Sequence, residues 1–426
     1  MTPKPIENFL ILTTIFVSSI TFFTTPFEGY FHYLIFLLFF PFFIFRYGFP
    51  KPPVQLLLLP LLIGVFHVFT GEDSVELFLK IFIGLLLSTT FYFYVFEYYE
   101  MNVEELFRLY IRGCVLVCWI GLIQLISYKV GFRLGYDYGW LFNKWAVIES
   151  AGRNIRLNSI FAEPVQLAVV IIPTVFVAFN SLFTKSDKYL SRLESVLIIV
   201  ILLLTKSSTG YIGIFVICLL FIVNYGHIVN LLIGAGALTV IFSTIYFYVP
   251  EFHERVESSI GLWVNEDLSV KNVNSSSFVL YNNFHIAFES FKNNPLGGGG
   301  LGSHKVAFEK YSLTKNFGVL NFAFNKSDAN SLFLRLMSET GIIGMGFVLL
   351  LIFKCYVRRK PGEEFSYYWI ISNSLLVMII LCLLRQGNYF LNGLPFFFWM
   401  YYYNFNLYQE KNKKESSIVP AIEAKV

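Results

Sequence analysis

The stretch from Phe278 to Phe347 decides how the chain is interpreted. It contains SFVLYNNFHIAFESFKNNPLGGGGLGSH at 277–304 and SDANSLFLRLMSETGIIGMGF at 327–347. An aromatic-rich amphipathic segment is followed by an Asn-Pro pair, a glycine cluster, a polar run, and an apolar segment that begins with an acid and an amide. Most of the remaining chain consists of apolar blocks long enough to cross a membrane. We therefore expect the other segments to be arranged around this one.

The composition indicates an all-α polytopic membrane helix bundle. Apolar residues make up 56% of the chain, aromatic residues 19% and charged residues 14%, whereas soluble domains carry about a quarter charged residues. The net charge of +4 is small and gives no indication of a nucleic-acid partner. Packing explains the cysteines better than metal binding or redox chemistry, since all of them fall in or beside apolar blocks. They are Cys114, Cys118, Cys218, Cys355 and Cys382.

The apolar blocks predict about twelve transmembrane spans and two long loops. The loops are 128–162 and 250–329, so the membrane domain covers 1–409 and leaves a polar tail at 410–426 that we expect to be disordered. The predicted spans are 9–25, 30–45, 54–70, 75–96, 108–127, 164–183, 194–206, 209–224, 228–249, 330–353, 366–384 and 391–408.

The positions of the basic residues predict the orientation of this bundle. With the N-terminus inside, the short outer turns carry almost no lysine or arginine, as the positive-inside rule requires. Both termini are then cytoplasmic and both long loops lie outside. The inner connections carry Arg46, Lys51, Arg108, Arg112, Lys185, Lys188, Arg192, Arg358, Arg359, Lys360, Lys411, Lys413 and Lys414.

Five basic residues depart from this pattern and mark a candidate site. They lie on the outer side, at or just inside the ends of spans, where a charge that faces lipid is costly. Snorkelling to lipid headgroups is the alternative for each of them. Several basic residues on one face of the bundle instead predict an anionic ligand that is bound at the outer surface. These residues are Arg153, Arg156, Lys206, Arg335 and Arg385.

Two short stretches between spans carry further polar groups. Pro164 suits the first turn of a helix, which places Glu163 at the N-terminal end of a span. Glu163 then either interacts with the helix dipole or pairs with Arg156 or acts as a general base. The second stretch, 206–210, is either a tight turn with a helix cap or a polar lining for a sugar or phosphate.

The segment 278–294 has the pattern of a helix that lies in the membrane interface and ends at an Asn-Pro pair. The glycines at 297–300 resemble a phosphate-binding loop, but a preceding strand and a following Gly-Lys-Ser/Thr are missing. A flexible hinge is therefore favoured over a diphosphate-binding nest. His304 follows as a candidate substrate ligand, with a structural histidine as the alternative.

The segment 328–331 opens the span at 330–353. Asp328 is either part of a helix cap or a free carboxylate at the outer interface, near Arg335. Glu339 lies deeper, and Gly341 is expected to allow close helix packing. No cluster of histidine, cysteine and carboxylate has the spacing of metal ligands, so neither a metal nor a cofactor is expected.

These motifs resemble the O-antigen polymerase and O-antigen ligase superfamily, the Wzy and WaaL types. The resemblance covers about a seventh of the chain, while the order of the motifs and the topology extend over nearly all of it. The Phe-Ala-Glu-Pro segment is more similar to polymerases than to ligases. The stretches that carry the resemblance are RLNSIFAEPVQLA (156–168), LLLTKSSTGYIGI (202–214), NNPLGGGGLGSH (293–304) and DANSLFLRLMSETGIIG (328–344).

The resemblance implies a glycosyltransferase of the bacterial inner membrane that polymerises repeat units linked to undecaprenyl diphosphate, a multi-pass enzyme without cofactor or metal. Ligase-like members usually carry a His-Asn pair where this chain has Ala329-Asn330, and often an arginine where it has Ser208, so a histidine-based mechanism is not expected. Glu163 or Asp328 would then be the base, and Arg156 and Arg385 would bind the diphosphate. The implied substrate-binding residues are Arg153, Lys206, His304, Asn330 and Arg335.

Two other functions remain open at this point. One is a ligase of the same superfamily, which transfers finished glycan to a different acceptor. The other is a flippase or transporter for lipid-linked oligosaccharides, although we find no internal repeat of the kind that transporters often show. Membrane lipid, a chain-length regulator and a flippase are further candidate partners, and a nucleic acid is not.

Overall fold

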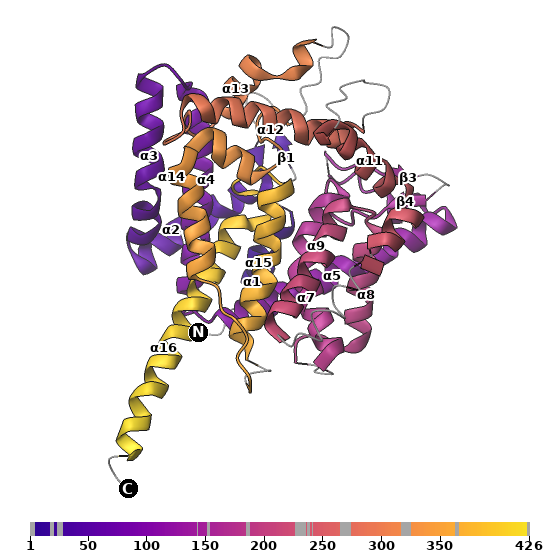
Figure 1. Ribbon diagram of the computed structural model, residues 1–426. Helices are drawn as coiled ribbons and strands as arrows, with labels where there is room; N and C mark the ends of the chain where they lie inside the picture. The colour runs from indigo at the N-terminus through magenta and orange to yellow at the C-terminus, as the bar shows by residue number, and fades with distance from the viewer. Residues whose placement is uncertain are drawn as a thin grey trace.

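The computed structural model is a bundle of helices (Figure 1). It describes residues 5–17, 21–23, 29–142, 144–150, 154–184, 188–225, 236, 239–240, 242–264, 274–316, 325–362 and 366–423. The long helices are α1 (Pro5–Phe16), α2 (Phe31–Tyr47), α3 (Lys51–Phe69), α4 (Val75–Tyr98), α5 (Val103–Val130), α7 (Pro164–Thr184), α8 (Arg192–Leu204), α9 (Ser208–Tyr225), α14 (Leu332–Lys354), α15 (Tyr367–Arg385) and α16 (Leu394–Glu423).

Other elements connect these helices at the ends of the bundle. Two small antiparallel hairpins are present: β1 pairs with β2, and β3 pairs with β4 with Ile148 opposite Arg156. The connecting elements are β1 (Thr21–Phe23), β2 (Gly29–Tyr30), α6 (Arg133–Tyr136), β3 (Ile148–Ser150), β4 (Asn154–Arg156), α11 (Pro250–Val264), α12 (Ser275–Asn293), α13 (His304–Tyr311) and the 3-10 helices η1 (Leu313–Asn316) and η2 (Leu391–Gly393).

The predicted class, an all-α polytopic membrane protein, is confirmed. Within the described residues, seven helices are long and apolar enough to cross a membrane: α3, α4, α5, α7, α9, α14 and α15. The helices α1 and α2 are apolar but shorter. The count of twelve spans stays a prediction, and half of the predicted span at 228–249 lies outside the described residues.

Helix α7 forms the centre of the bundle and packs against α5, α8, α9 and α15. Its side chains from Val169 to Ala178 are almost completely inaccessible to solvent. The hydroxyl of Tyr110 on α5 donates to the carbonyl of Val170, and the neighbouring thiols of Cys114 and Cys118 are fully buried. These two cysteines therefore belong to the packed core, as the sequence indicates.

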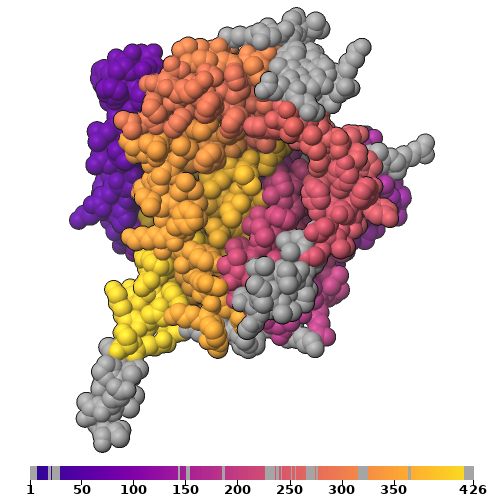
Figure 2. Space-filling view, in the orientation of Figure 1, coloured from indigo at the N-terminus to yellow at the C-terminus, as the bar shows by residue number. Residues whose placement is uncertain are grey.

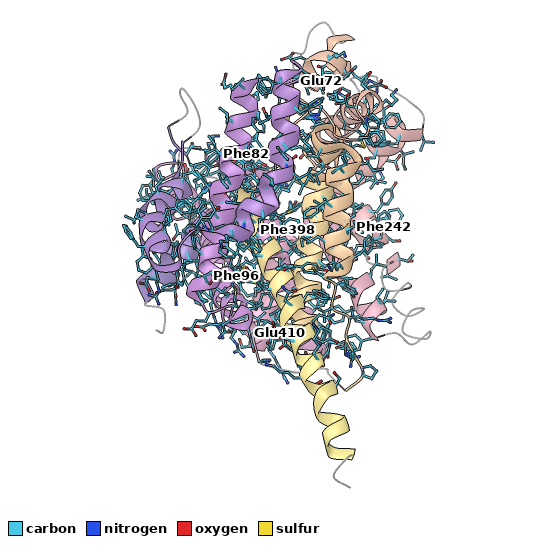
Figure 3. All side chains as sticks on the ribbon, turned by 90° about the vertical axis from the view of Figure 1, so that its left-hand side faces the viewer. Glu72, Phe82, Phe96, Phe242, Phe398 and Glu410 are labelled. Atoms are coloured by element: carbon cyan, nitrogen blue, oxygen red, sulfur yellow. The ribbon has the colours of Figure 1, made fainter. Side chains whose placement is uncertain are left out.

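A layer of three helices, α11 to α13, covers one end of the bundle (Figure 1). Helix α12 lies across this end, and its last residue, Asn293, confirms the stop predicted at the Asn-Pro pair. Glu72, in the turn between α3 and α4, lies at the same end, whereas Glu410 on α16 lies at the opposite end (Figure 3). Below α12 the surface is hollowed between α14 and α11, where α15 and α9 are visible (Figure 2).

The C-terminal segment is helical over most of its length. Helix α16 continues to Glu423, and the disorder expected for the tail at 410–426 stays a prediction. The run of glutamate, lysine and glutamine at its exposed end has a high intrinsic helix propensity, which accounts for the continuation.

Candidate functional site

One side of the site is formed where strand β4 lies against the junction between α8 and α9. The backbone N–H of Leu157 donates to the carbonyl of Leu204 at 3.1 Å, and Nε of Arg156 donates to the carbonyl of Thr205 at 3.3 Å. Lys206 follows directly in the turn, with a positive φ of 47°. The turn predicted for this stretch is thus present, and it brings Arg156 and Lys206 to the same place.

A buried hydrogen-bond network holds the turn that joins β4 to α7. Gln124 on α5 accepts from the N–H of Ser159 and donates to Oδ1 of Asn158, both at 2.9 Å. The amide of Asn158 donates to the carbonyl of Phe161 at 2.9 Å, and the indole N–H of Trp145 donates to the carbonyl of Ser159 at 2.8 Å. All of these polar groups are satisfied, and the network ties the chain between Arg156 and Glu163 to α5.

Glu163 stands directly before the first residue of α7, as the sequence predicts for the residue before Pro164. Its side chain remains exposed. Desolvation by the surrounding protein raises the pKa of this carboxyl, repulsion from Asp328 raises it further, and attraction to Arg156 lowers it. A carboxyl from the second half of the chain thus influences the charge state of one from the first half.

Asp328 belongs to a turn that precedes α14 and is not its N-cap. Its Oδ1 accepts from the amide of Asn325 and the N–H of Asn330, while the N-cap is Ser331, whose hydroxyl accepts from Leu334 N. The Ser331 hydroxyl also donates to the carbonyl of Leu383 at 2.6 Å. This bond fastens the turn to the end of α15.

Gly387 allows the same turn to approach the residues that follow α15. A Cβ atom at this position would lie 1.4 Å from the carbonyl oxygen of Asp328. Only glycine permits such a backbone contact. Because Arg385 is two residues away, the contact brings its segment against the segment that carries Asp328.

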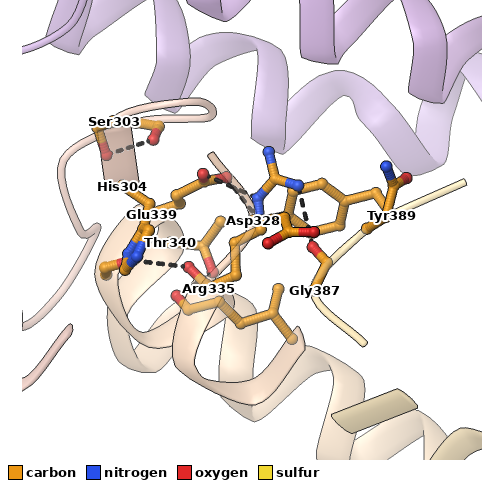
Figure 4. Close-up of polar contacts among 12 residues, drawn as sticks. Ser303, His304, Asp328, Arg335, Glu339, Thr340, Gly387 and Tyr389 are labelled. Atoms are coloured by element: carbon orange, nitrogen blue, oxygen red, sulfur yellow. Dashed lines mark hydrogen bonds and ion pairs between the residues drawn. The ribbon is translucent and has the colours of Figure 1, made fainter. Parts of the chain in front are cut away.

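A buried ion pair lies beneath this contact (Figure 4). Nε of Arg335 donates to Oε1 of Glu339 at 2.9 Å, and Nη1 donates to the carbonyl of Gly387 at 2.9 Å. The hydroxyl of Tyr389 donates to Oε2 of Glu339 at 2.8 Å, and its ring lies 4.4 Å from the guanidinium carbon of Arg335. The side chains of Arg335 and Glu339 are 2% and 0% exposed.

The glycine cluster completes a break in α14. Gly341 has φ 56° and ψ −152°, which interrupts the helix. The N–H groups of Gly299 and Gly300 donate to the carbonyls of Ser338 and Glu339, and the N–H of Ile342 donates to the carbonyl of Pro295, each at 2.9 Å. The N–H groups of the glycine cluster thus bond the carbonyls that the break in α14 leaves without helical partners. Gly341 allows the close packing expected of it, since a Cβ atom there would lie 2.6 Å from the carbonyl oxygens of Pro295 and Leu296. The hinge and the diphosphate nest stay alternatives.

His304 lies inside this region. Its Nε2 donates to Oδ1 of Asn283 at 3.0 Å, and its Nδ1 pairs with the hydroxyl of Ser338 at 2.9 Å. Burial lowers the pKa of the imidazole to about 3, and the charge of Arg335 contributes to the same direction. The ring is therefore neutral, and both nitrogens are occupied within the protein; a role in substrate binding stays a prediction.

Asp73 is a buried acid that the sequence analysis did not select. It is 8% exposed, in the turn between α3 and α4 next to Gly300. Its Oδ2 has no hydrogen-bond partner among the described residues. An acidic turn between two apolar spans was the only signal, and it did not distinguish this residue from the exposed Glu72 beside it.

The structure thus brings most of the predicted site residues to one end of the bundle. Arg156 lies at the turn of Lys206, Asn330 and the segment of Arg385 adjoin Asp328, and Arg335 and His304 are buried. Arg153 lies outside the described residues. Among the residues that the structure describes, no group of three histidine, cysteine or carboxylate side chains is arranged to hold a metal ion.

Comparison with known proteins gives one family. Residues 193–349 match the family model described as O-antigen ligase, Wzy_C, and this range contains α8, α9, α12 and the broken first half of α14. Comparison with curated protein sequences gives no match. The family match supports an O-antigen ligase or polymerase type of function in general and does not distinguish between the two. Together with the bundle of membrane-spanning helices, it supports membership of this chain in the O-antigen polymerase and ligase superfamily.

Proposed function

We propose that the protein polymerises lipid-linked oligosaccharide repeat units on the outer side of a bacterial cytoplasmic membrane. The donor is a growing glycan on undecaprenyl diphosphate, and the acceptor is a repeat unit on the same kind of carrier. The product is an O-antigen, capsule or exopolysaccharide. Both termini are cytoplasmic, and the end covered by α11 to α13 faces outward.

The observation that carries this proposal is that Glu163 is coupled electrostatically both to Asp328, a second carboxyl, and to Arg156. A glycosyl transfer needs a base for the acceptor hydroxyl, and a carboxyl with a raised pKa is a stronger base than an ordinary carboxylate. Glu163 is therefore the better candidate for the base, and Asp328 is the neighbour that raises its basicity.

In the proposed reaction the acceptor hydroxyl oxygen attacks the anomeric carbon of the donor. A new glycosidic C–O bond forms, the bond from the anomeric carbon to the diphosphate oxygen breaks, and the hydroxyl proton passes to Glu163. The lipid diphosphate leaves with the bonding electron pair. Arg156, Lys206 and Arg385 stabilise its developing negative charge, since preorganised cations can do this without a metal.

The surface below α12 is consistent with a lipid-linked substrate. The hollow between α14 and α11 opens sideways (Figure 2), where the hydrocarbon of a bilayer would surround the helices. A polyprenyl chain lying there would keep its diphosphate near the outer end of the bundle. The energy for transfer is already present in the diphosphate linkage, so no nucleotide is needed at this site.

The glycan ladder of a deletion strain tests the proposal. The strain is complemented with the wild-type chain or with Glu163→Gln, Arg156→Ala or Arg385→Ala, and protein levels are checked by immunoblot. We expect single repeat units on the final carrier for the deletion and for all three variants. Arg133→Lys serves as a control, since this exposed arginine pairs with Asp137 on the same outer side, and its ladder should be normal.

A ligase is the second candidate, because the matching family model is described as O-antigen ligase. Long chains that accumulate on the lipid carrier in the deletion strain would support this candidate. A deletion strain without any repeat unit on the outer side would support a flippase instead. Either pattern would contradict the polymerase proposal.

A further inference from the structure

Three buried side chains form a unit that we call the clamp: Arg335 and Glu339 on α14, and Tyr389 after α15. The two oxygens of the Glu339 carboxylate are shared between Nε of Arg335 and the hydroxyl of Tyr389. The ring of Tyr389, which is 9% exposed, lies against the guanidinium. Arg335 and Glu339 are one helical turn apart, so the first half of α14 holds both of them in a fixed relation.

The clamp reaches the outer residues through Gly387. Nη1 of Arg335 donates to the Gly387 carbonyl, and the Gly387 backbone is pressed against the carbonyl of Asp328. Arg335 also lies within electrostatic range of Asp328. Movement of the guanidinium would therefore shift the segment of Arg385 relative to the turn of Asp328.

A buried ion pair often stabilises a folded protein no better than apolar side chains in the same place would. Removing two charges from water costs several kcal/mol for each ion, and well-packed apolar residues often stabilise a core equally well or better. The clamp gives one thing that apolar packing does not, a set of directional bonds that admits a single arrangement of Arg335, Glu339 and Gly387.

We propose that Arg335, Glu339 and Tyr389 are positioning residues that fix Arg385 and Asp328 relative to one another for glycosyl transfer. The inference rests on the proposed function for its kinetic test. In this role Arg335 acts through Gly387, and contact between Arg335 and the substrate is not required. Glu339 bonds the guanidinium, and Tyr389 bonds Glu339 and packs its ring against the guanidinium.

Conservative variants test the clamp. Tyr389→Phe removes the hydrogen bond to Glu339 and keeps the ring against Arg335. Glu339→Gln keeps the shape of the side chain and removes its charge. Arg335→Lys keeps the positive charge but cannot reproduce the two hydrogen bonds of the planar guanidinium to Glu339 and Gly387. Arg133→Lys is the matched control, because the exposed Arg133 makes the same type of i,i+4 pair, Nε to a carboxylate at 3.1 Å.

The assay is glycosyl transfer by the purified protein in nanodiscs, with the lipid-linked repeat unit extracted from the deletion strain as substrate. A displacement of about 1 Å in a catalytic group lowers the rate by about 100-fold, so we expect kcat to fall about 10- to 100-fold in Glu339→Gln and Arg335→Lys. A smaller decrease is expected for Tyr389→Phe. KM should stay near the wild-type value in all three.

Direct substrate binding by Arg335 gives a different pattern. In that case Arg335→Lys raises KM, while Tyr389→Phe and Glu339→Gln retain wild-type kinetics. This pattern would overturn the proposal, as would wild-type kinetics in all three variants.

A second measurement needs no activity. Gln386→Cys, in a background with Cys218→Ser, is labelled with a membrane-impermeant maleimide in the presence and absence of each clamp variant. Loss of the clamp should free the segment and increase the labelling rate, and an unchanged rate in folded protein would overturn the inference. Because this rate is independent of the reaction, it separates failure of the clamp from failure of the polymerase proposal, which the glycan ladder of the deletion strain decides.

Discussion

Replacing Asp73 by asparagine should stabilise the protein at alkaline pH. The Oδ1 atom of Asp73 accepts from the N–H of Ser74 at 2.8 Å, but Oδ2 has no hydrogen-bond partner among the described residues. Burial raises the pKa of this carboxyl from 3.8 to about 7; the bond to Ser74 opposes the increase, and repulsion from Glu339 adds to it. The folded protein thus holds a proton on Asp73 that the unfolded chain loses near pH 4.

The sign of the effect on stability follows from this proton. Between pH 4 and pH 7 the folded state binds one more proton at Asp73 than the unfolded state, so the free energy of unfolding decreases as the pH rises. Each pH unit is worth about 1.4 kcal/mol. The interval from 3.8 to about 7 therefore corresponds to a loss of at most about 4 kcal/mol, which is complete above pH 7.

Asp73→Asn removes this loss, because the carboxamide is neutral at every pH and its oxygen can still accept from Ser74. We expect equal stability of the variant and the wild type at pH 4 and a higher melting temperature of the variant at pH 8. The measurement is thermal unfolding in detergent micelles, followed by tryptophan fluorescence. Glu76→Gln is the control, since it neutralises an exposed carboxyl only three residues away.

A lower stability of Asp73→Asn than of the wild type at pH 8 would refute the claim that ionised Asp73 destabilises the folded protein. That result would mean that the carboxylate is ionised and has a favourable partner that offsets its burial. Equal destabilisation at both pH values would point to lost packing instead and would contradict the titration argument as well.

The remaining predictions concern the broken helix and the outer turns. Gly341→Ala should cost about 1–3 kcal/mol in backbone strain plus a clash with the carbonyl of Leu296, whereas Gly346→Ala on the same helix meets no atom within 4 Å and should change the melting temperature little. In Asp328→Asn the loss of repulsion lowers the pKa of Glu163, so the acid limb of the residual transfer activity should move to lower pH; an unchanged limb would exclude Glu163 as the base. Gln124→Leu leaves two buried polar groups unsatisfied and should reduce the free energy of unfolding by about 2–4 kcal/mol, which denaturant titration can measure.

Local signals in the sequence were sufficient to predict several boundaries of the fold. Pro164 can begin a helix because it lacks only an N–H that the first turn does not use, and α7 begins there. The Asn-Pro pair after Asn293 ends α12 for a similarly local reason. Basic residues that depart from the charge asymmetry do find specific partners, as a charge in such a position requires: Arg156 bonds the carbonyl of Thr205 beside Lys206, and Arg335 bonds the carbonyl of Gly387.

The break in α14 and the buried polar groups could not be predicted in the same way. Gly341 has a local sequence suited to a continuous span. The N–H groups after it, on Ile342 and Ile343, donate to carbonyls at Pro295 and Leu296, more than 40 residues earlier. Tyr389 has a structural role only because Glu339 accepts its hydrogen bond. Gln124 has one only because it accepts from the N–H of Ser159. Each of these residues is ordinary in its own segment, and its role depends on the tertiary contact.

The charges of the site are divided between two layers, and this division fits the proposed reaction. In the lower layer Arg335 and Glu339 neutralise one another, the His304 ring is uncharged, and Asp73 holds a proton below about pH 7. The cations that could bind a diphosphate therefore stand in the outer layer, where an anionic substrate can reach them without entering the core. An unbalanced charge below would act on these outer groups through a medium of low dielectric constant, where electrostatic interactions are strong. The buried pair thus allows Glu163 to be tuned by its immediate neighbours, Asp328 and Arg156, and the effect of each neighbour can be measured separately.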